Sequence, residues 1–519
     1  MNVFVFRENG DIGDYVFFNC IRGEDVTMSK LSSLKRILAL ALCVCVTSAM
    51  FVICSDDVYA KPAALNSGFA TAAVATILDA STVSYSAVLP SIPASDDGVL
   101  YLYQLQVYEY AIAPTAAPIA TSAMSQTPTM TFALNRGTAS TRLYSKFALA
   151  VKQGGVPVMI AEPQFVSNPE ILATHTHAQA PRSLKGMQGQ RFTNLYIGAA
   201  NEVPPSLMPQ CVKVLNTGAD QLLTNPYSRA DQLATDPHPM TDVDLFMMNA
   251  ADAAGVAHLA ERMEYFAANA SKTDEWIIGN ECNVRKRNEI RWLGWDEYMR
   301  QYEQVFRVCY IAIKSNNANA RVLTCIDQNW DRNRPASHAE YYEFIDGKDF
   351  LTTFAADSRK GGDMNWGLAI QPYTVPLTYA KFWDMSGCPS GGYCAQQVRQ
   401  NKMISFQNIG TVVSFMQTPA MVNAMGAPRP IIFSELGISA DQGDAVQAAA
   451  LCASYVAAER FYPYIDEIFY VNVTAGGVNG TFGPATMDMF NNMDGANALA
   501  YRANAMATIG ISDWSQVLR

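Results

Sequence analysis

The sequence predicts an α/β protein: a (β/α)8 (TIM) barrel preceded by a small β-sandwich-like N-terminal domain. From about residue 183 onward, short apolar runs alternate with amphipathic segments of helical period, as in parallel strands joined by crossover helices. No glycine-rich phosphate loop accompanies this alternation, which favours a barrel over a doubly wound sheet. Residues 61–170 contain few charges and carry period-two patterns instead. We therefore divide the chain into residues 1–60, 61–170 and 183–519.

The composition excludes several classes of protein. The chain has 519 residues and a net charge of −10, with 50% hydrophobic and 16% charged residues. It is too apolar for a disordered protein and too acidic for a nucleic-acid binder that neutralises phosphates. No apolar run after residue 60 is long enough to cross a bilayer. The negative charge is also a weak argument against an anionic substrate.

Residues 1–60 resemble a processing signal rather than part of the fold. A basic segment ending at Arg36 precedes the apolar run 37–54, and a small-x-Ala site follows at 58–60. These are the parts of a secretory signal peptide, which we place at 28–60. An uncleaved membrane anchor is the alternative, but two aspartates just before the site favour cleavage. We expect a secreted or cell-surface protein with no stable membrane insertion.

The N-terminal domain is predicted from alternation and turn signals. Residues 101–108 alternate in the period-two pattern of a strand. The apolar segments 147–151 and 156–161 flank two consecutive glycines, which predicts a β-hairpin. The aromatic residues of these strands are interpreted as core residues in preference to a sugar-stacking surface.

The barrel strands are predicted where short apolar runs end in polar residues. They are 276–279, 321–326, 366–370, 430–433 and 467–471. Helices are predicted at 298–315, from apolar positions on one face, and at 445–462. The pattern between residues 183 and 275 leaves strands one to three unplaced.

Two of these strands end at glutamates. Asn280-Glu281 follows the run 276–279, and Glu435 follows the run 430–433. If these are strands four and seven, their carboxylates face each other across the barrel mouth, where reactive groups of such barrels lie. Hydrolysis of a glycosidic bond needs one carboxyl to protonate the leaving oxygen and a second to attack or to activate water. We assign Glu281 as acid/base and Glu435 as nucleophile, with the Asn280 amide on the sugar 2-hydroxyl.

An Asn-Glu pair alone is a weak signal. It recurs at 288–289, in a polar and arginine-rich stretch that we interpret as solvated, and at 201–202, which follows the apolar run 195–198. If the pair at 201–202 ended the fourth strand, Glu435 would lie beyond the seventh strand. Either glutamate by itself is equally compatible with a helix start or a salt bridge, so the assignment depends on both strand ends together.

Other residues at the predicted mouth have two interpretations each. Tyr373 either hydrogen-bonds Glu435 or is a turn tyrosine. Trp330 is either a stacking platform for a sugar or a loop-packing residue, and Asp327 either contacts sugar hydroxyls or caps a loop. Asn283 and Asn472 are hydrogen-bonding candidates without further support.

The cysteines and histidines predict no metal centre. Cys388 and Cys394 bracket the turn-rich segment 389–393 and are candidates for a small disulfide in an oxidising compartment. No Cys/His pair has zinc-site spacing, and the histidines are scattered. We expect neither a metal nor another cofactor.

Four ordered motifs carry a family resemblance. The Asn-Glu on strand four with a Glu on strand seven looks like clan A glycoside hydrolases, which are retaining (β/α)8 barrels. The four motifs are Trp276-Ile-Ile-Gly-Asn-Glu-Cys-Asn283, Tyr310-Ile-Ala-Ile-Lys-Ser315, Trp366-Gly-Leu-Ala-Ile-Gln-Pro-Tyr373 and Ile432-Phe-Ser-Glu-Leu-Gly-Ile438. Through them, roughly residues 145–475 more closely resemble a secreted bacterial family filed as domain of unknown function 5722. This resemblance implies Glu281 as acid/base, Glu435 as nucleophile and Tyr373 as a site residue.

The chain departs from that family at two places. The sixth-strand motif of the family carries His before Pro-Tyr, where this chain has Gln371, and a neutral amide does not titrate as an imidazole does. The eighth strand, near Asn472, lacks the basic and acidic residues associated with the family. We expect a secreted retaining glycoside hydrolase acting on an oligo- or polysaccharide. The alternative is a non-catalytic carbohydrate-binding or cell-surface protein on a degenerate glycosidase barrel.

Overall fold

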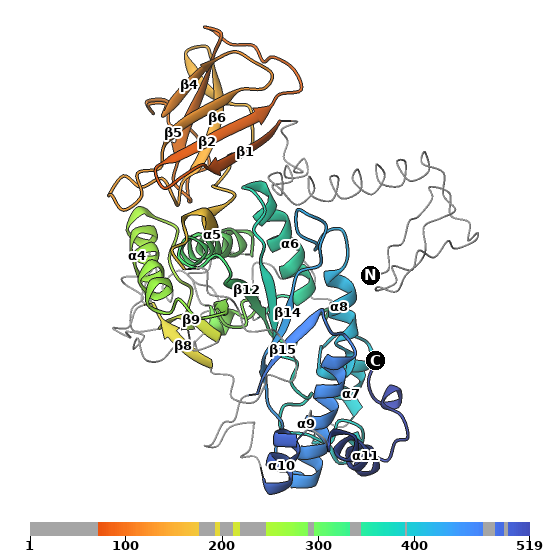
Figure 1. Cartoon of the computed structure of the whole chain (residues 1–519). Helices are drawn as coiled ribbons and strands as arrows, with labels where there is room; N and C mark the ends of the chain where they lie inside the picture. The colour runs from red at the N-terminus through yellow and green to blue at the C-terminus, as the bar shows by residue number, and fades with distance from the viewer. Residues whose placement is uncertain are drawn as a thin grey trace, which may run out of the picture. The chain divides into compact units, whose positions relative to one another are not determined.

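The computed structural model divides into two units, residues 1–60 and 61–519, and all described residues, drawn in colour in Figure 1, belong to the second. It describes residues 71–175, 192–197, 211–217, 245–288, 295–332, 344–389, 392–470, 483–492 and 497–519. The predicted signal peptide lies outside these residues. Within them, no helix has both the length and the apolar character needed to cross a membrane.

Antiparallel strands form the first part of the second unit. One sheet has the order β1-β2-β5 and the other the order β4-β3-β6-β7. Their bounds are β1 Ala72–Ile77, β2 Thr82–Val88, β3 Val99–Leu105, β4 Ala120–Ala123, β5 Thr129–Ala133, β6 Lys146–Gln153 and β7 Val156–Met159. The predicted hairpin is present as β6 and β7, joined through Gly154 and Gly155, which both have positive φ as the tight turn requires.

The two sheets contact each other through alternating side chains. Val83 and Tyr85 of β2 are buried, and so are Leu100 and Leu102 of β3. Between the sheets the rings of β5 and β6 meet, with centroids 4.5 Å apart. Burial on alternate residues explains the period-two pattern of this region. The β-sandwich-like arrangement of the whole domain stays a prediction.

A larger, mostly parallel sheet follows, with the order β8-β9-β11-β12-β13-β14-β15 and β10 antiparallel to the end of β9. Its strands are β8 Phe192–Tyr196, β9 Cys211–Thr217, β10 Leu245–Phe246, β11 Glu275–Ile278, β12 Arg321–Ile326, β13 Gly367–Ile370, β14 Ile431–Leu436 and β15 Ile465–Tyr470. The five strands that the sequence predicts correspond to β11 to β15. Strands β8 and β9 lie in the stretch where the pattern places none.

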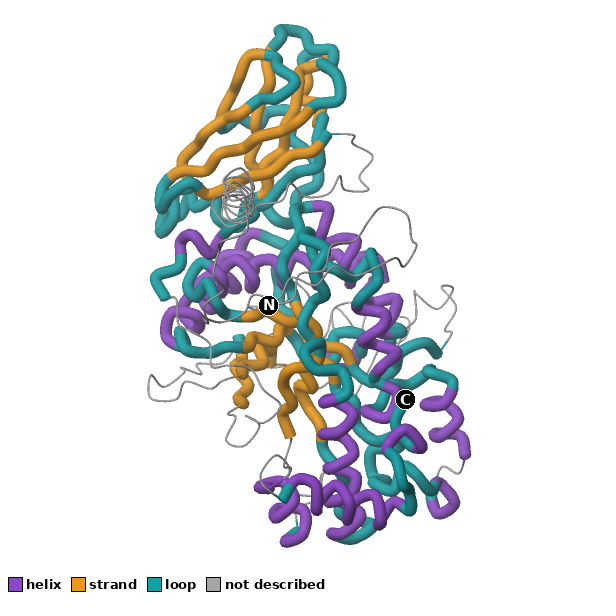
Figure 2. Tube along the Cα trace, turned by 45° about the vertical axis from the view of Figure 1, so that its right-hand side comes forward, coloured by secondary structure: helices purple, strands orange, loops and turns teal. Residues whose placement is uncertain are grey.

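Helices alternate with these strands. The α-helices of the described residues are α4 Ala253–Asn269, α5 Trp295–Lys314, α6 Gly347–Lys360, α7 Gly392–Arg399, α8 Gly410–Met416, α9 Asp444–Glu459, α10 Pro484–Asn492 and α11 Ala498–Ile509. Short 3-10 turns are η1 Pro169–Leu172, η4 Arg285–Arg287, η6 Met385–Gly387, η7 Phe406–Asn408 and η8 Trp514–Gln516. Figure 2 shows the strands of the large sheet gathered between helices. This covering explains why β11 and β13 are buried along their whole length.

Aromatic side chains join neighbouring helices over the sheet. Tyr302 and Phe306 of α5 lie on the face that the sequence predicts to be apolar, and both are fully buried. Their rings contact α6, with Tyr302 5.4 Å from Phe350 and Phe306 5.0 Å from Phe354 between centroids. Such ring pairs bury large apolar areas, so they fix these two crossover helices against each other.

The large sheet is curled. Arg321, the first residue of β12, pairs with Glu275 on the adjacent β11 and also with Asp466 on β15, both at 2.8 Å. Strands β13 and β14 lie between β12 and β15, so a flat sheet would separate the two by about 14 Å. The ion pair therefore requires a strongly bent sheet. Among the described residues β8 pairs only with β9 and β15 only with β14, so a closed eight-stranded barrel stays a prediction.

Candidate active site

Glu281 lies in a tight turn directly after β11. Gly279 has φ +84°, and a Cβ added there would lie 2.6 Å from the Cys282 Sγ, so the turn requires glycine at this position. Glu281 itself has φ +45°, in the left-handed region, where a residue with a side chain pays about 1–2 kcal/mol. Strain of this kind collects at functional sites, because the surrounding structure has to hold it in place.

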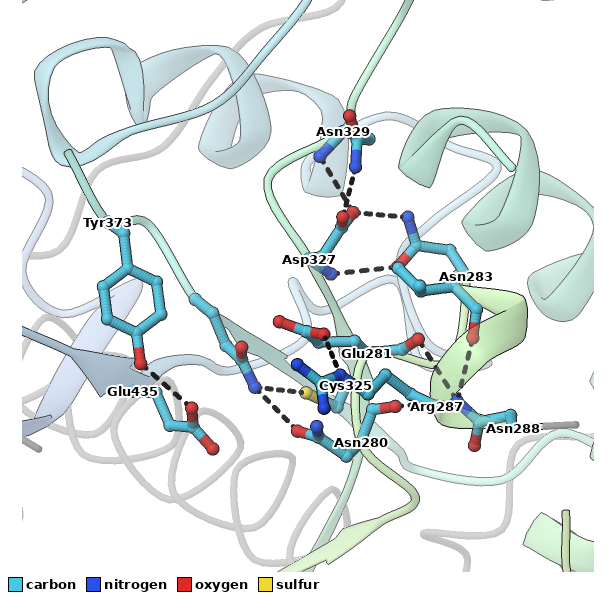
Figure 3. Close-up of polar contacts among 12 residues, drawn as sticks. Asn280, Glu281, Asn283, Arg287, Asn288, Cys325, Asp327, Asn329, Tyr373 and Glu435 are labelled. Atoms are coloured by element: carbon cyan, nitrogen blue, oxygen red, sulfur yellow. Dashed lines mark hydrogen bonds and ion pairs between the residues drawn. The ribbon is translucent and has the colours of Figure 1, made fainter. Parts of the chain in front are cut away.

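Buried polar groups brace this turn. The Asn288 Nδ2 donates to the carbonyl oxygens of Asn280, at 2.7 Å, and of Glu281, at 3.2 Å (Figure 3). On the other side, the Cys282 amide donates to the Cys325 carbonyl at the end of β12, at 2.7 Å. The interpretation of the pair 288–289 as solvated is therefore wrong for Asn288, which is buried because it satisfies the turn.

The Glu281 carboxyl titrates near neutrality. Its side chain is 20% exposed, and its Oε2 lies 3.1 Å from the Arg287 Nε. Burial raises the pKa of Glu281 to about 7, and the negative charges of Asp327 and Glu435 act in the same direction. The cations Arg287 and Lys213 oppose this rise. A carboxyl in such surroundings carries a proton at neutral pH for about half of the time.

Glu435 lies near the end of β14, and both of its carboxylate oxygens have partners. The Lys213 ammonium forms an ion pair with Oε1. The Tyr373 hydroxyl donates to Oε2 at 3.0 Å, which is the hydrogen bond that the sequence predicts for this tyrosine. Figure 3 shows the Tyr373 ring pointing at Glu435 from the segment after β13. The two contacts fix the position and orientation of the carboxylate.

Sequence reasoning missed Lys213. Its side chain is only 2% exposed, and its Nζ also donates to the Asn280 Oδ1 at 2.6 Å. Burial alone would lower the pKa of Lys213, but the acidic groups around it, Glu435 foremost, together outweigh burial and raise it, so the ammonium keeps its charge. A lysine in the middle of the apolar run Cys211–Leu215 was the available signal, because such a position is rare without a buried partner.

Asn280 is held by two donors on one atom. Its Oδ1 accepts from Lys213 and also from the Gln371 Nε2, at 2.8 Å. Gln371 is buried after β13 and also contacts the Cys325 Sγ at 3.6 Å. Because Oδ1 faces both donors, the amide orientation is set and Nδ2 is the group left to donate. In the described part of the chain, no hydrogen bond uses this Nδ2.

Asp327 and Asn283 form a reciprocal pair between the loops after β11 and β12. The Asn283 Nδ2 donates to the Asp327 carboxylate at 2.6 Å, and its Oδ1 accepts from the Asp327 amide at 2.9 Å. The same carboxylate accepts from the backbone amide of Asn329, at 2.8 Å, and from its side chain. Burial raises the pKa of Asp327 against these hydrogen bonds. The contacts are those of a loop cap, the second of the two predicted roles for Asp327.

The remaining predicted residues do not join this group. Trp330 is 3% exposed and packs edge to face against Phe415, with centroids 5.2 Å apart, so it is a loop-packing residue and the stacking role is wrong. Asn472 lies outside the described residues, as does the pair 201–202. Cys388 is buried and Cys394 is half-buried, and a disulfide between them stays a prediction.

The site therefore combines two carboxyl groups in different surroundings. Strands β9, β11, β13 and β14 bring together the side chains of Lys213, Asn280, Gln371, Tyr373 and Glu435. Glu281 adds a carboxyl that exchanges protons near neutrality, beside a second carboxylate that is fixed by a cation. Within the described residues, no three His, Cys, Asp or Glu side chains are grouped so that they could hold a metal ion. Such a pair suits acid/base work on one side of a bond and attack from the other.

Several solved structures resemble this chain at low identity. A family 39 glycoside hydrolase from the gut symbiont Bacteroides cellulosilyticus WH2 is 13% identical over 75% of this chain and 74% of its own, with a TM-score of 0.34. A GH128 (subgroup II) endo-β-1,3-glucanase from Sorangium cellulosum is 13% identical over 45% and 73%, with a TM-score of 0.26. The GH53 catalytic domain from Ignisphaera aggregans is 12% identical over 54% and 79%, with a TM-score of 0.28.

The curated proteins give no match to this chain. A sequence model of a family of unknown function, DUF5722, matches residues 213–517, which is more than half of the chain. The matched segment begins at the buried Lys213 and contains both glutamates of the site, as well as Asn280 and Tyr373. The chain therefore belongs to the family of unknown function DUF5722.

Proposed function

We propose that this protein is a retaining glycoside hydrolase that acts on an oligo- or polysaccharide at the mouth of a closed (β/α)8 barrel. The observation that carries the proposal is the contrast between its two carboxyl groups. Burial raises the pKa of Glu281 to about 7, whereas Glu435 lies against the ammonium of Lys213. Titratable groups whose surroundings differ in this way are the mark of an acid and a nucleophile that work together.

Glu281 is the general acid and then the general base. In the first step it gives its proton to the glycosidic oxygen as the bond to the anomeric carbon breaks. In the second step it takes a proton from the water that attacks the same carbon. Because the acid form is required first and its pKa is about 7, we expect kcat/KM to fall about tenfold per pH unit above that value.

Glu435 is the nucleophile. One of its oxygens bonds to the anomeric carbon to form a glycosyl ester, and water releases the sugar and restores the carboxylate. The Lys213 ammonium and the Tyr373 hydroxyl hold the carboxylate oxygens so that little reorganisation is needed for attack. The Asn280 Nδ2 is oriented to donate to the sugar 2-hydroxyl, a contact that strengthens in the transition state.

The decisive variant is Glu435→Gln, which keeps the shape of the side chain and removes its charge. We expect turnover of a broad polysaccharide panel to fall by roughly 10⁴-fold while binding of the same glycan is retained. Glu261→Gln, on the exposed side of α4, is a matched control that should retain full activity. In proton NMR of the first turnovers, the wild type should release the anomer of the substrate. Release of the opposite anomer contradicts retention, and full activity of Glu435→Gln contradicts the mechanism.

The second candidate is a non-catalytic carbohydrate-binding protein. Its support is that both glutamates are ion-paired, Glu281 with Arg287 and Glu435 with Lys213. Ion pairs stabilise both carboxylates in the charged form, which suits binding better than proton transfer. The two candidates separate on the wild-type protein alone. Calorimetric binding of a glycan without release of reducing ends over long incubation favours the binding protein, and any turnover that depends on Glu435 favours the hydrolase.

Secretion is part of the same proposal and has its own test. Signal peptides are removed after a small-x-Ala site, which here is 58–60. N-terminal sequencing of the protein recovered from the medium should start at Lys61. Recovery of an intact segment 28–60 in the membrane fraction would identify an uncleaved anchor instead.

A further inference from the structure

A basic turn lies against the candidate acid. The 3-10 turn η4, Arg285–Arg287, consists of three consecutive basic residues and begins four residues after Glu281. Arg285 is buried, whereas the Arg287 side chain is 37% exposed and reaches back to Glu281. Figure 3 shows Arg287 extending over the turn that carries Asn280 and Glu281. A chain with a net charge of −10 thus places a cation at the point where the proton transfer is proposed.

This ion pair conflicts with the acid role. Glu281 has to hold a proton when it meets the glycosidic oxygen. The Arg287 guanidinium favours the ionised form and lowers the pKa of Glu281 against the effect of burial. The conflict disappears when another anion binds the Arg287 guanidinium. Glu281 then loses the ion pair that favours its ionised form.

We infer that Arg287 binds a negatively charged group of the substrate, a carboxylate or a sulfate next to the scissile bond, so that the glycan is acidic. The inference rests on the proposed hydrolase function and gives it a substrate class. A guanidinium is planar and presents paired donors, which suits a carboxylate or sulfate better than an ammonium does. Its side chain is 37% exposed at the ion pair, so an anion of a ligand can reach the guanidinium.

The exchange leaves the charge of the site unchanged. The groups that act on Glu281 are Asp327 and Glu435, which are negative, and Arg287 and Lys213, which are positive. With Glu281 ionised these groups and Glu281 sum to one negative charge. When the substrate anion binds Arg287 and Glu281 binds a proton, the sum that includes the substrate anion is again one negative charge. Substrate binding is thereby coupled to protonation of the acid, which a neutral glycan does not achieve.

The test compares each acidic polysaccharide with a derivative that lacks one kind of charged group. Alginate, polygalacturonate and glucuronoxylan are assayed beside their carboxyl-reduced forms, which keep the linkages and lose the carboxylates. Chondroitin sulfate is assayed beside its desulfated form, which keeps the linkages and the carboxylates and loses only the sulfates. We expect kcat/KM of the wild type to be at least about tenfold higher on one native form. Loss on carboxyl reduction identifies a uronate, and loss on desulfation identifies a sulfate ester.

Variants of Arg287 assign the preference to this residue. Arg287→Met should abolish the preference for the charged form, and Arg287→Lys should retain part of it as a point charge. Arg332→Met is the matched control, because Arg332 lies after β12 on the same rim and contacts Asn329 and Phe344 rather than Glu281. Melting temperatures of all variants confirm folding.

A second measurement does not depend on turnover. The Glu281 carboxyl is followed by carbon-13 NMR, with Glu281→Gln used for assignment, and its apparent pKa should rise when an acidic oligosaccharide is added. Equal turnover of charged and neutral forms, or an unchanged preference in Arg287→Met, overturns the inference and leaves the hydrolase standing. Failure of the wild type to bind or cleave any of these glycans, charged or neutral, removes the hydrolase and the inference together.

Discussion

At the amino ends of β11, β12 and β15, one cation is enclosed by carboxylates, whereas at the carboxyl ends each glutamate has its own cation. Arg321 lies among Glu275, Asp466 and Glu467, with nitrogen–oxygen distances of 2.8, 2.8 and 3.6 Å. Burial lowers the pKa of Arg321 but its acidic neighbours outweigh burial and raise it. This cluster joins three strands, because all three nitrogens of the Arg321 guanidinium contact carboxylates.

The charged groups at the carboxyl ends of the strands are more exposed. The Glu281 and Glu435 side chains are each about one-fifth exposed, at 20% and 22%, and among the described residues each forms an ion pair with one cation. The backbone of Glu281 is strained, and its carboxyl titrates near neutral pH. Charged side chains thus join strands at one end of the sheet, whereas at the other end the proposed function assigns them to catalysis, as in barrels whose chemistry lies at the C-terminal face.

The largest effect is expected at the enclosed cluster. Arg321→Met leaves Glu275 and Glu467 buried without their cation, so the free energy of unfolding should fall by about 3–5 kcal/mol. Denaturant unfolding measures this loss. Lys348→Met is the control, since its ion pair with Asp331 is exposed and is worth at most about 1 kcal/mol. Equal losses in the two variants would contradict the structural role of the cluster.

At the reactive end, Lys213→Met should affect activity more than stability. It removes the cation that positions Glu435 and one of the two donors to Asn280, so we expect kcat to fall about 10²–10³-fold. Lys213→Arg keeps the charge and should recover part of kcat. An unchanged kcat with a large loss of stability would show that Lys213, like Arg321, has a structural role.

The charge of Glu281 is expected to lower stability, whereas the charge of Arg321 is expected to raise it. Its pKa of about 7 in the folded protein lies above the usual value of 4.5, so the folded state binds more protons than the unfolded state between these pH values. Stability from this group is complete below about pH 4.5 and is lost as the pH rises through 7, by about 3 kcal/mol in total. Glu281→Gln should therefore be more stable than wild type at pH 8 and equal to it at pH 4.

Thermal unfolding of both proteins across this pH range measures the difference. A wild-type protein that gains stability from Glu281 as the pH rises would show that the Arg287 ion pair dominates over burial. That outcome would also remove the basis for an acid role at neutral pH, because Glu281 would then be ionised throughout.

The sequence pattern was sufficient for strands that are buried on both sides. The bounds predicted for Arg321–Ile326 match those of β12, and the predicted ends of β11 and β13 lie within one residue of the observed ends. A short apolar run that ends in polar residues is compatible with few structures other than a buried strand. The polar ends of those runs then located Asn280 and Glu281. The sequence pattern does not decide whether the sheet closes into a barrel, because closure would depend on the strands before β11, whose pattern is weak.

The missed residues depend on contacts between distant segments. Lys213 gains its role from Glu435, 222 residues away, and no local pattern records that pairing. Gln371 stands where the family motif carries His, which suggests a lost role, yet its amide donates to Asn280. Trp330 is ambiguous in sequence because its burial is decided by Phe415 on another element. Such roles follow from packing, which the pattern of a single segment does not contain.

The smallest predicted effect concerns Tyr373, which touches the nucleophile but carries no charge. Tyr373→Phe removes one hydrogen bond to the Glu435 carboxylate, worth about 1.5–3 kcal/mol when one partner is charged, while the Lys213 ion pair remains. We expect kcat to fall roughly 10- to 100-fold with little change in KM, since the contact orients the attacking oxygen rather than the glycan. Tyr379→Phe, whose hydroxyl donates to a backbone carbonyl, is the matched control and should leave kcat unchanged. A rise in KM alone would place Tyr373 among the residues that bind sugar, and Glu435 would then be held by Lys213 without help from the hydroxyl.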